Sequence, residues 1–139
     1  MSSKSTVDNV LLFSFRRCWD GRGTLIPITA NEDFPFSIAR VFIVYNVPEG
    51  DDRGNHAHRK CSQVLQCLSG TIKVACTDKD KTISYTLDEP AKALLIPPGI
   101  WAQQIYYEKN TILQCYCDRK YEEEDYIRDM SIYKAWKND

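Results

Sequence analysis

The only two histidines of the chain, His56 and His58, are separated by a single residue. Side chains two residues apart on a β-strand point to the same face of the sheet, so a strand here would direct both imidazoles into one cavity. Histidine is the side chain whose unperturbed pKa lies closest to neutral pH. A pair of imidazoles in a pocket therefore indicates either a metal site or proton transfer.

The residues around the histidines follow a regular spacing. Gly50 stands six positions before His56, and Gly70 stands twelve positions after His58, with Gln63 between them. This spacing resembles the first motif of the cupin barrel family, in which a ligand glutamate occupies the position of Gln63.

A second segment extends this resemblance. The second cupin motif is Pro-x-Gly-x-x-His, and residues 97–102 match it except that Ala102 replaces the last ligand. Of the four side chains that hold a metal in metal-binding cupins, only the two histidines remain. Two imidazoles with an uncharged amide make a poor divalent-metal site. We therefore expect no metal, which leaves the histidines available for acid–base chemistry.

The rest of the chain reads as short strands separated by Gly, Pro and Asp turns, which is typical of an all-β sandwich or barrel. Besides the histidine strand, they are predicted at residues 9–15, 24–28, 36–47, 62–68, 71–77, 82–87, 93–96, 101–107 and 111–117. The only plausible helix lies in the charged and aromatic tail, 121–136. The cupin resemblance selects a double-stranded β-helix (a jelly-roll barrel) with a short C-terminal helix, and residues 1–139 are expected to form a single cupin domain.

Composition excludes several function classes. A formal net charge of −1 offers no electrostatic basis for binding nucleic acid or a membrane surface. The apolar run Val10–Phe13 is too short for a signal segment or a membrane span, so we expect a cytoplasmic protein. Cysteines such as Cys115 and Cys117 lie in apolar or alternating runs, which indicates small core residues rather than a disulfide framework.

Several further segments, taken in order, carry a more specific resemblance. They are Arg22-Gly23, Pro35–Val41, Arg53–Lys60, Gln63–Leu65, Pro98–Trp101 and Tyr121–Arg128. Together they resemble the cupin nucleotide-sugar 3,4-ketoisomerases of the FdtA/QdtA/WxcM-like group. The resemblance implies that the carbonyl of a dTDP-4-keto-6-deoxyglucose moves from C4 to C3, without metal or other cofactor, on the way to amino sugars of surface polysaccharides.

The resemblance also assigns roles to residues. It makes His58 the expected base and His56 its partner, although the sequence leaves open which of them takes the C3 proton. The enediolate and the nucleotide diphosphate both need cationic neighbours, for which arginine is well suited. The candidates are Arg22, Arg40 and Arg53.

Three more side chains complete the predicted substrate site: Gln63, Trp101 and Gln103. Ala102 stands where many relatives carry a histidine or another polar group that reaches the sugar. Arg22 resembles the branch of the family that forms the galacto product, which slightly favours that stereochemistry. The segment Asp125–Arg128 is interpreted as a structural lock on the C-terminus.

Alternative functions follow from the same fold. A nucleotide-sugar 3,5-epimerase is also a cupin, but it pairs a histidine with an aspartate and uses a tyrosine acid, and no His–Asp constellation is evident in the sequence. A non-catalytic sugar-nucleotide-binding cupin would use the histidines only as hydrogen-bonding groups. A metal-dependent oxygenase would require glutamate at Gln63 and histidine at Ala102. Small cupins usually pair, so we expect a homodimer that exchanges residues 9–15.

Overall fold

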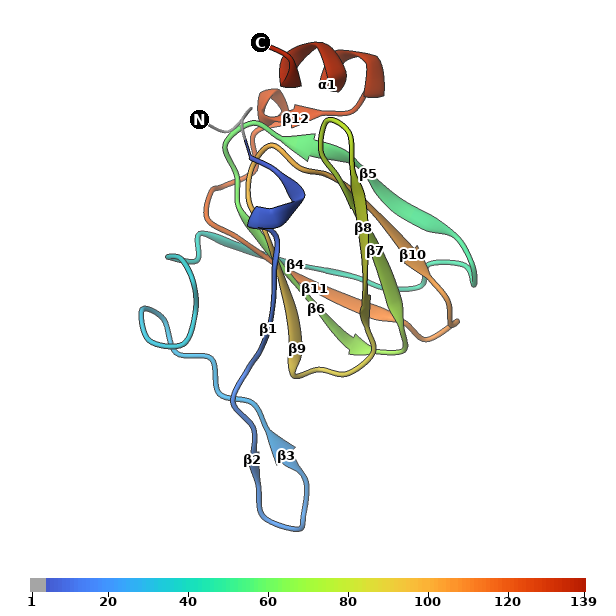
Figure 1. The fold of residues 1–139 in the computed structure, drawn as a ribbon. Helices are drawn as coiled ribbons and strands as arrows, with labels where there is room; N and C mark the ends of the chain where they lie inside the picture. The colour runs from blue at the N-terminus through green and yellow to red at the C-terminus, as the bar shows by residue number, and fades with distance from the viewer. Residues whose placement is uncertain (1–4) are drawn as a thin grey trace.

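The computed structural model describes residues 5–139 and consists mainly of two five-stranded antiparallel sheets (Figure 1). One sheet has the strand order β1-β9-β6-β11-β4, and the other has the order β12-β5-β10-β7-β8. Their strands are β1 (Leu11–Ser14), β4 (Arg40–Val44), β5 (Asp52–His58), β6 (Gln63–Ser69), β7 (Ile72–Thr77), β8 (Thr82–Leu87), β9 (Lys92–Ile96), β10 (Trp101–Tyr106), β11 (Ile112–Cys117) and β12 (Tyr126–Ile127). The predicted all-β jelly-roll barrel with a short C-terminal helix is confirmed.

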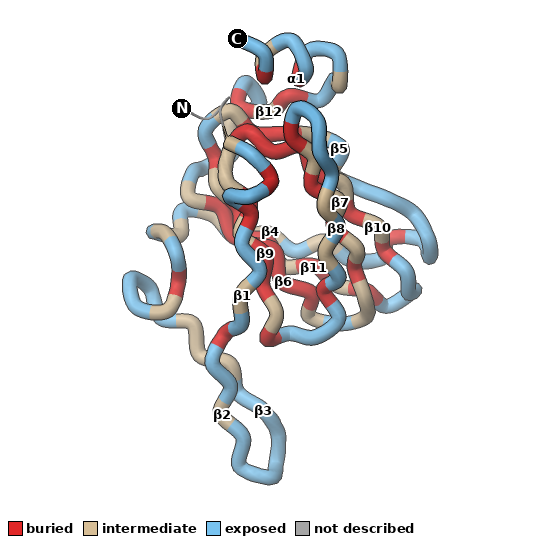
Figure 2. The backbone as a smooth tube through the Cα atoms, viewed as in Figure 1, coloured by how far each residue is buried: buried red, intermediate tan, exposed pale blue. Residues whose placement is uncertain are grey.

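The core lies between the two sheets. Strand β7 alternates buried and half-buried residues along its length, as expected for a strand with one face on a core. The interior contains Leu65, Val74 and Leu113, none of which is more than 1% exposed. Figure 2 shows this buried interior inside a more exposed rim. The six cysteines are all free.

A second apolar cluster covers the outer face of the first sheet. The segment that follows β1 runs back across this face and packs Phe15 and Phe34 against Tyr116. Strand β1 itself pairs with β9 of its own chain, from Leu11 opposite Leu95 to Ser14 opposite Lys92. Residues 9–15, predicted to cross to a partner, are therefore placed on their own sheet in this chain.

The hairpin of β2 (Cys18–Trp19) and β3 (Thr24–Leu25) projects away from the barrel (Figure 1). Trp19 is 75% exposed and Leu25 is 64% exposed, so the hairpin displays apolar side chains with little cover. The strand predicted at 24–28 ends at Leu25, shortly before Pro27, which has no N–H to donate to a ladder.

The C-terminal tail caps one end of the barrel. Helix α1 (Met130–Lys137) begins after Asp129, whose carboxylate accepts a hydrogen bond from the N–H of Ile132 at 3.0 Å. Tyr133 anchors the helix, since its hydroxyl donates to the carbonyl of Gly99 at 2.9 Å. Across residues 5–139, no helix is both long and apolar enough to cross a membrane.

Candidate active site

Strand β5 places both histidines on the inner face of the barrel. His56 lies opposite Ala102 of β10, and His58 lies opposite Tyr126 of β12. Ala57, between them, points the other way into the apolar cluster beneath α1. Gly54 has a φ of +87°, and a Cβ there would lie 3.0 Å from the carbonyl oxygen of Ala102, so only glycine lets the two strands approach closely at this bulge.

A buried carboxylate orients His58. The Nδ1 atom of His58 lies 2.8 Å from Oδ2 of Asp125, and both side chains are buried. Asp125 is itself fixed by the backbone N–H groups of Lys60, at 2.7 Å, and Cys61, at 3.3 Å. The sequence interpretation, in which no His–Asp constellation was evident, is therefore wrong, because the tail interpreted as a structural lock supplies the aspartate.

The arrangement leaves one nitrogen of each imidazole free to act. With Nδ1 of His58 donating to Asp125, its Nε2 carries the lone pair, and this atom is buried without a hydrogen-bond partner among the described residues. The Nδ1 atom of His56 is likewise buried and unpartnered within the described chain. One nitrogen of each imidazole is thus buried without a hydrogen bond among the described residues, and in His58 that nitrogen is the basic one.

Both imidazoles are held in their neutral forms near pH 7. Burial, with a smaller contribution from His58, lowers the pKa of His56 to about 4. Burial also lowers the pKa of His58, and the hydrogen bond and charge of Asp125 offset part of that effect. A neutral imidazole is the form that can accept a proton, so the pair is competent as general base.

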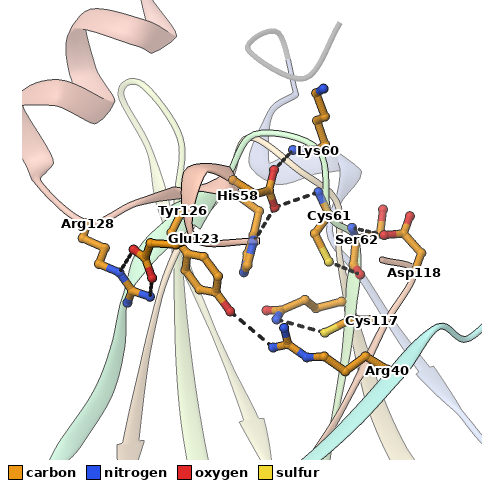
Figure 3. A network of polar contacts seen from close by, with 12 residues as sticks. Arg40, His58, Lys60, Cys61, Ser62, Cys117, Asp118, Glu123, Tyr126 and Arg128 are labelled. Carbon is orange, nitrogen blue, oxygen red and sulfur yellow. Dashed lines mark hydrogen bonds and ion pairs between the residues drawn. The ribbon is translucent and has the colours of Figure 1, made fainter. Parts of the chain in front are cut away.

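An aromatic and a cationic side chain complete the wall beside the histidines. The Tyr126 ring lies 5.0 Å from the His56 ring and 4.3 Å from the His58 ring, centroid to centroid. Arg40 of β4 donates from Nη2 to the Tyr126 hydroxyl at 3.3 Å (Figure 3). Its guanidinium also lies 4.9 Å from the centre of the Phe42 ring, which fixes its orientation.

The histidines border two cavities. The larger, of about 210 Å³, is lined by Arg40, Phe42, Val44, Arg53, Gly54, His56, Gln63, Gln104, Tyr126 and Arg128. The smaller, of about 10 Å³, is more enclosed and has His56, His58, Cys61, Gln63 and Gln104 in its wall. A space of this size holds about one water-sized occupant. The larger cavity is polar and rich in arginine, which suits an anionic ligand.

Three of the six predicted substrate-binding residues, Arg40, Arg53 and Gln63, line the larger cavity. The other three do not. Trp101 is buried against Tyr133 beneath α1. Gln103 points outward and donates to Asp52 at 2.9 Å.

Arg22 lies farthest from the predicted site. It belongs to the turn of the projecting hairpin, where its side chain is 89% exposed and 3.7 Å from Asp20. Neither histidine cavity has a wall residue from β2 or β3 in the part of the chain that the structure describes.

Sequence reasoning missed four residues of the site: Asp125, Tyr126, Arg128 and Gln104. The signal for Gln104 was strand alternation, since Ala102 faces the cavity and Gln104 is two residues further along β10. The tail residues belong to a segment that carries the family resemblance, but nothing in it indicated a contact with the histidines, because Asp125 is 67 residues from His58 in sequence.

The side chains at the cupin metal positions do not fit that metal site. The amide of Gln63 donates to the sulfur of Cys117 at 3.5 Å, and Ala102 contributes only a methyl group. Neither is a carboxylate or imidazole ligand, so no step of the chemistry is assigned to an ion held at these four positions.

The family model described as FdtA (WxcM-like, C-terminal) matches residues 8–138. The chain is 34% identical over 125 residues to TDP-4-oxo-6-deoxy-alpha-D-glucose-3,4-oxoisomerase of Aneurinibacillus thermoaerophilus, an alignment covering 90% of each protein. Among solved structures, QdtA, a sugar 3,4-ketoisomerase from Thermoanaerobacterium thermosaccharolyticum in complex with TDP, is 33% identical and superposes with a TM-score of 0.90, covering 94% of this chain and 95% of QdtA.

A dTDP-4-dehydrorhamnose 3,5-epimerase from Bacillus anthracis also superposes, with a TM-score of 0.77 over 88% of this chain and 79% of the epimerase. At 19% identity this likeness concerns the fold alone. The family match spans nearly the whole chain and agrees with the paired histidines of β5. The chain belongs to the FdtA, WxcM-like family of cupin sugar isomerases.

Proposed function

We propose that the chain is a metal-independent isomerase that moves the keto group of dTDP-4-keto-6-deoxyglucose from C4 to C3. The observation that carries this proposal is the free Nε2 of His58, buried at the smaller cavity while Asp125 holds the opposite ring nitrogen, next to His56, which lines both cavities. The named activity of the Aneurinibacillus relative supports it, as does a QdtA variant solved in complex with TDP-4-keto-6-deoxyglucose.

In the proposed mechanism His58 acts as the base. Its Nε2 takes the proton from C3, and the electron pair of that C–H bond forms a C3–C4 double bond while the C4 carbonyl oxygen gains negative charge. His56 transfers protons between the two oxygens, so that O4 becomes a hydroxyl and O3 loses its hydrogen. Protonated His58, whose Nε2 proton exchanges with solvent, then delivers a proton to C4, which completes the 3-keto sugar and returns His58 to its neutral form. The number of protons on the sugar is unchanged.

The charge that develops on the enediolate needs a positive or hydrogen-bonding neighbour. Arg40 and the Tyr126 hydroxyl form such a pair in the cavity wall. His58 is buried and His56 is half-buried, so this region is poorly solvated, which strengthens electrostatic interactions there. We therefore assign Arg40 and Tyr126 to stabilising the intermediate.

The larger cavity is too small to enclose the nucleotide as well as the sugar. A volume of about 210 Å³ is below the range of about 300–1,000 Å³ typical of pockets that enclose drug-sized ligands. We infer that the sugar occupies the cavity and the diphosphate lies at its mouth, where Arg53 and Arg128 line the wall.

Because a 3,5-epimerase also uses a His–Asp pair, this pair does not distinguish the two activities. The identity of the reaction product distinguishes them. Incubating the protein, treated with chelator, with dTDP-4-keto-6-deoxyglucose should yield the 3-keto sugar by NMR. The resemblance of Arg22 to the galacto branch leads us to expect the galacto configuration at C4. A product with the ketone still at C4 and inverted C3 or C5 would identify an epimerase, and unchanged sugar would indicate a binding protein.

We further propose a homodimer, with the β2–β3 hairpin rather than residues 9–15 reaching the partner. The hairpin displays Trp19 and Leu25 to solvent and carries Arg22, which the family resemblance places at the substrate. A second copy of the chain would cover Trp19 and Leu25, and its substrate site would be completed by Arg22 of the first copy. Light scattering should give about twice the chain mass of 16.1 kDa, and Trp19→Glu should shift the protein toward monomer. A monomeric wild type would contradict the dimer.

A further inference from the structure

Three side chains line both of the cavities beside the histidines: His56, Gln63 and Gln104. The proposed reaction uses His56, but no step of it uses the amide of Gln104. Gln104 lies two residues beyond Ala102 on β10, so both side chains face the barrel interior. Gln104 is only 9% exposed, and buried polar groups in folded proteins nearly always have hydrogen-bond partners. The partners of its amide therefore indicate what the side chain does.

A buried tyrosine fixes the orientation of the Gln104 amide. The hydroxyl of Tyr106, which is 0% exposed, donates to Oε1 of Gln104 at 2.8 Å. With the amide reversed, the tyrosine O–H would lack an acceptor, because this is the only hydrogen bond of that hydroxyl among the described residues. The nitrogen, Nε2, is therefore the free end of the amide, and it has no acceptor in the part of the chain that the structure describes.

The free amide nitrogen lies beside the wall of the larger cavity. A Cβ at Gly54, which lines that cavity, would lie 3.5 Å from Nε2 of Gln104. In the strand order β12-β5-β10, Gln104 stands on one side of the histidine strand and Tyr126 stands on the other. The Tyr126 hydroxyl, already assigned to the enediolate, and the Gln104 amide therefore flank the histidines.

A second pair with the same spacing shows the pattern of a purely structural amide. Gln114 and Tyr116 lie two residues apart on β11, on the outer face of the first sheet and away from both cavities. The Gln114 amide donates to the Tyr116 hydroxyl at 2.7 Å, and that hydroxyl donates to Oε1 of Gln66 at 2.6 Å. Donors of the outer pair thus end on protein acceptors, whereas the donor of Gln104 faces the space assigned to the sugar.

We propose that Nε2 of Gln104 donates a hydrogen bond to an oxygen of the reacting sugar and stabilises the enediolate there, on the side of the histidines opposite Tyr126. The enediolate carries two oxygens, O3 and O4, so donors from two different strands serve one oxygen each. Tyr106 is then a positioning residue, which acts only through the amide that it orients. This inference rests on the proposed function, to which it adds one donor and the residue that aims it.

Two substitutions test the donor. Gln104→Leu removes it without adding charge, and kcat for dTDP-4-keto-6-deoxyglucose should fall by about 10²–10³-fold, the cost of losing one donor to an oxyanion. Gln104→Glu keeps an oxygen that accepts from Tyr106 but replaces the N–H by a negative charge, so its kcat should fall by at least about 10²-fold. Gln114→Leu makes the matched change in the outer pair and should leave kcat at the wild-type level.

Thermal unfolding shows which of these variants remain folded. A folded Gln104→Leu or Gln104→Glu protein with wild-type kcat, measured on a preparation whose wild type forms the 3-keto sugar, would overturn the inference and leave the proposed function standing.

A double-mutant cycle tests the role of Tyr106. Tyr106→Phe leaves the amide in place but free to turn, and misplacing a group by about 1 Å costs up to about 10²-fold in rate, so kcat should fall by about tenfold or more. In the Gln104→Leu background the same change should have no effect on kcat, because the group that it positions is absent. An equal loss of kcat in both backgrounds would show that Tyr106 supports the barrel and does not aim the amide.

NMR measures the contact itself in the wild type, without relying on turnover. The side-chain N–H signals of Gln104 should shift when dTDP-4-keto-6-deoxyglucose is added and should stay near their free positions with TDP, which lacks the sugar. Signals that respond equally to the two ligands would overturn the contact. A wild type that forms no 3-keto product but shows the sugar-specific shift would refute the proposed function and leave the contact standing.

Discussion

Replacing His58 by Asn should lower kcat by about 10²–10⁴-fold, the range expected when a general acid–base group is lost. Asparagine is close in size and fills part of the same space, but its amide does not accept a proton near neutral pH. The proposed base would be absent while the cavity and its arginines stay in place. Turnover of dTDP-4-keto-6-deoxyglucose, followed by NMR, measures the effect.

Nucleotide binding provides the control for this variant. The diphosphate is assigned to Arg53 and Arg128, which line the larger cavity, whereas His58 does not. Calorimetric titration with TDP should therefore give an affinity within about threefold of the wild type. A His58→Asn protein that retains wild-type kcat would show that another group takes the C3 proton.

Replacing Asp125 by Asn should lower kcat by at least about 10-fold and should also move the pH profile. The carboxylate accepts a hydrogen bond from Nδ1 of His58, whereas an amide in that position allows the opposite tautomer, in which Nε2 is protonated and cannot act as base. Asp125 also raises the pKa of His58 against the effect of burial. Without it the pKa falls further, so the acidic limb of kcat/KM should shift to lower pH.

Asp118→Asn is a matched control for this change. Asp118 also anchors a turn, by accepting a hydrogen bond from the N–H of Ser62 at 2.9 Å, but its carboxylate forms no hydrogen bond with either histidine among the described residues. Both variants should lose some thermal stability, because each weakens a bond that holds the segment after β5. Only Asp125→Asn should shift the pH profile. If Asp125→Asn changed neither the pH profile of kcat/KM nor kcat, Asp125 would have only a structural role.

The strands were predictable because their determinants are local, whereas the choice of a jelly-roll barrel over a sandwich came from the cupin resemblance. Each strand is a short alternating or apolar run bounded by turn residues, and turn glycines such as Gly70 and Gly99 have positive φ values that favour glycine. The histidine pair was equally accessible, since two residues two apart on a strand must share a face. These features follow from spacing alone.

The rest of the site depends on contacts between distant segments. Asp125 reaches His58 only because β12 pairs with the end of β5. No residue pattern within the tail predicts that pairing. Trp101 and Gln103 were assigned to the substrate from motif positions, yet the barrel places one beneath α1 and the other on the outside. Sequence motifs mark which residues recur together, whereas the sheet register decides which face each occupies.

The thiols illustrate the same limit. Cys115 and Cys117 were predicted as small core residues, and their burial agrees with that prediction. The hydrogen bond from the Gln63 amide to the Cys117 sulfur was not predictable, because the two residues lie on different strands and meet only when β6 pairs with β11.

The claim on which the function depends is that an imidazole removes the C3 proton and that solvent-exchangeable hydrogen arrives at C4. Running the reaction in deuterated buffer with metal-free protein, and examining the 3-keto product by NMR and mass spectrometry, tests this directly. We expect deuterium at C4 of the product, and loss of this labelled product in the His58→Asn variant. A 3-keto product without deuterium at C4, as a direct hydride shift from C3 would give, would contradict it.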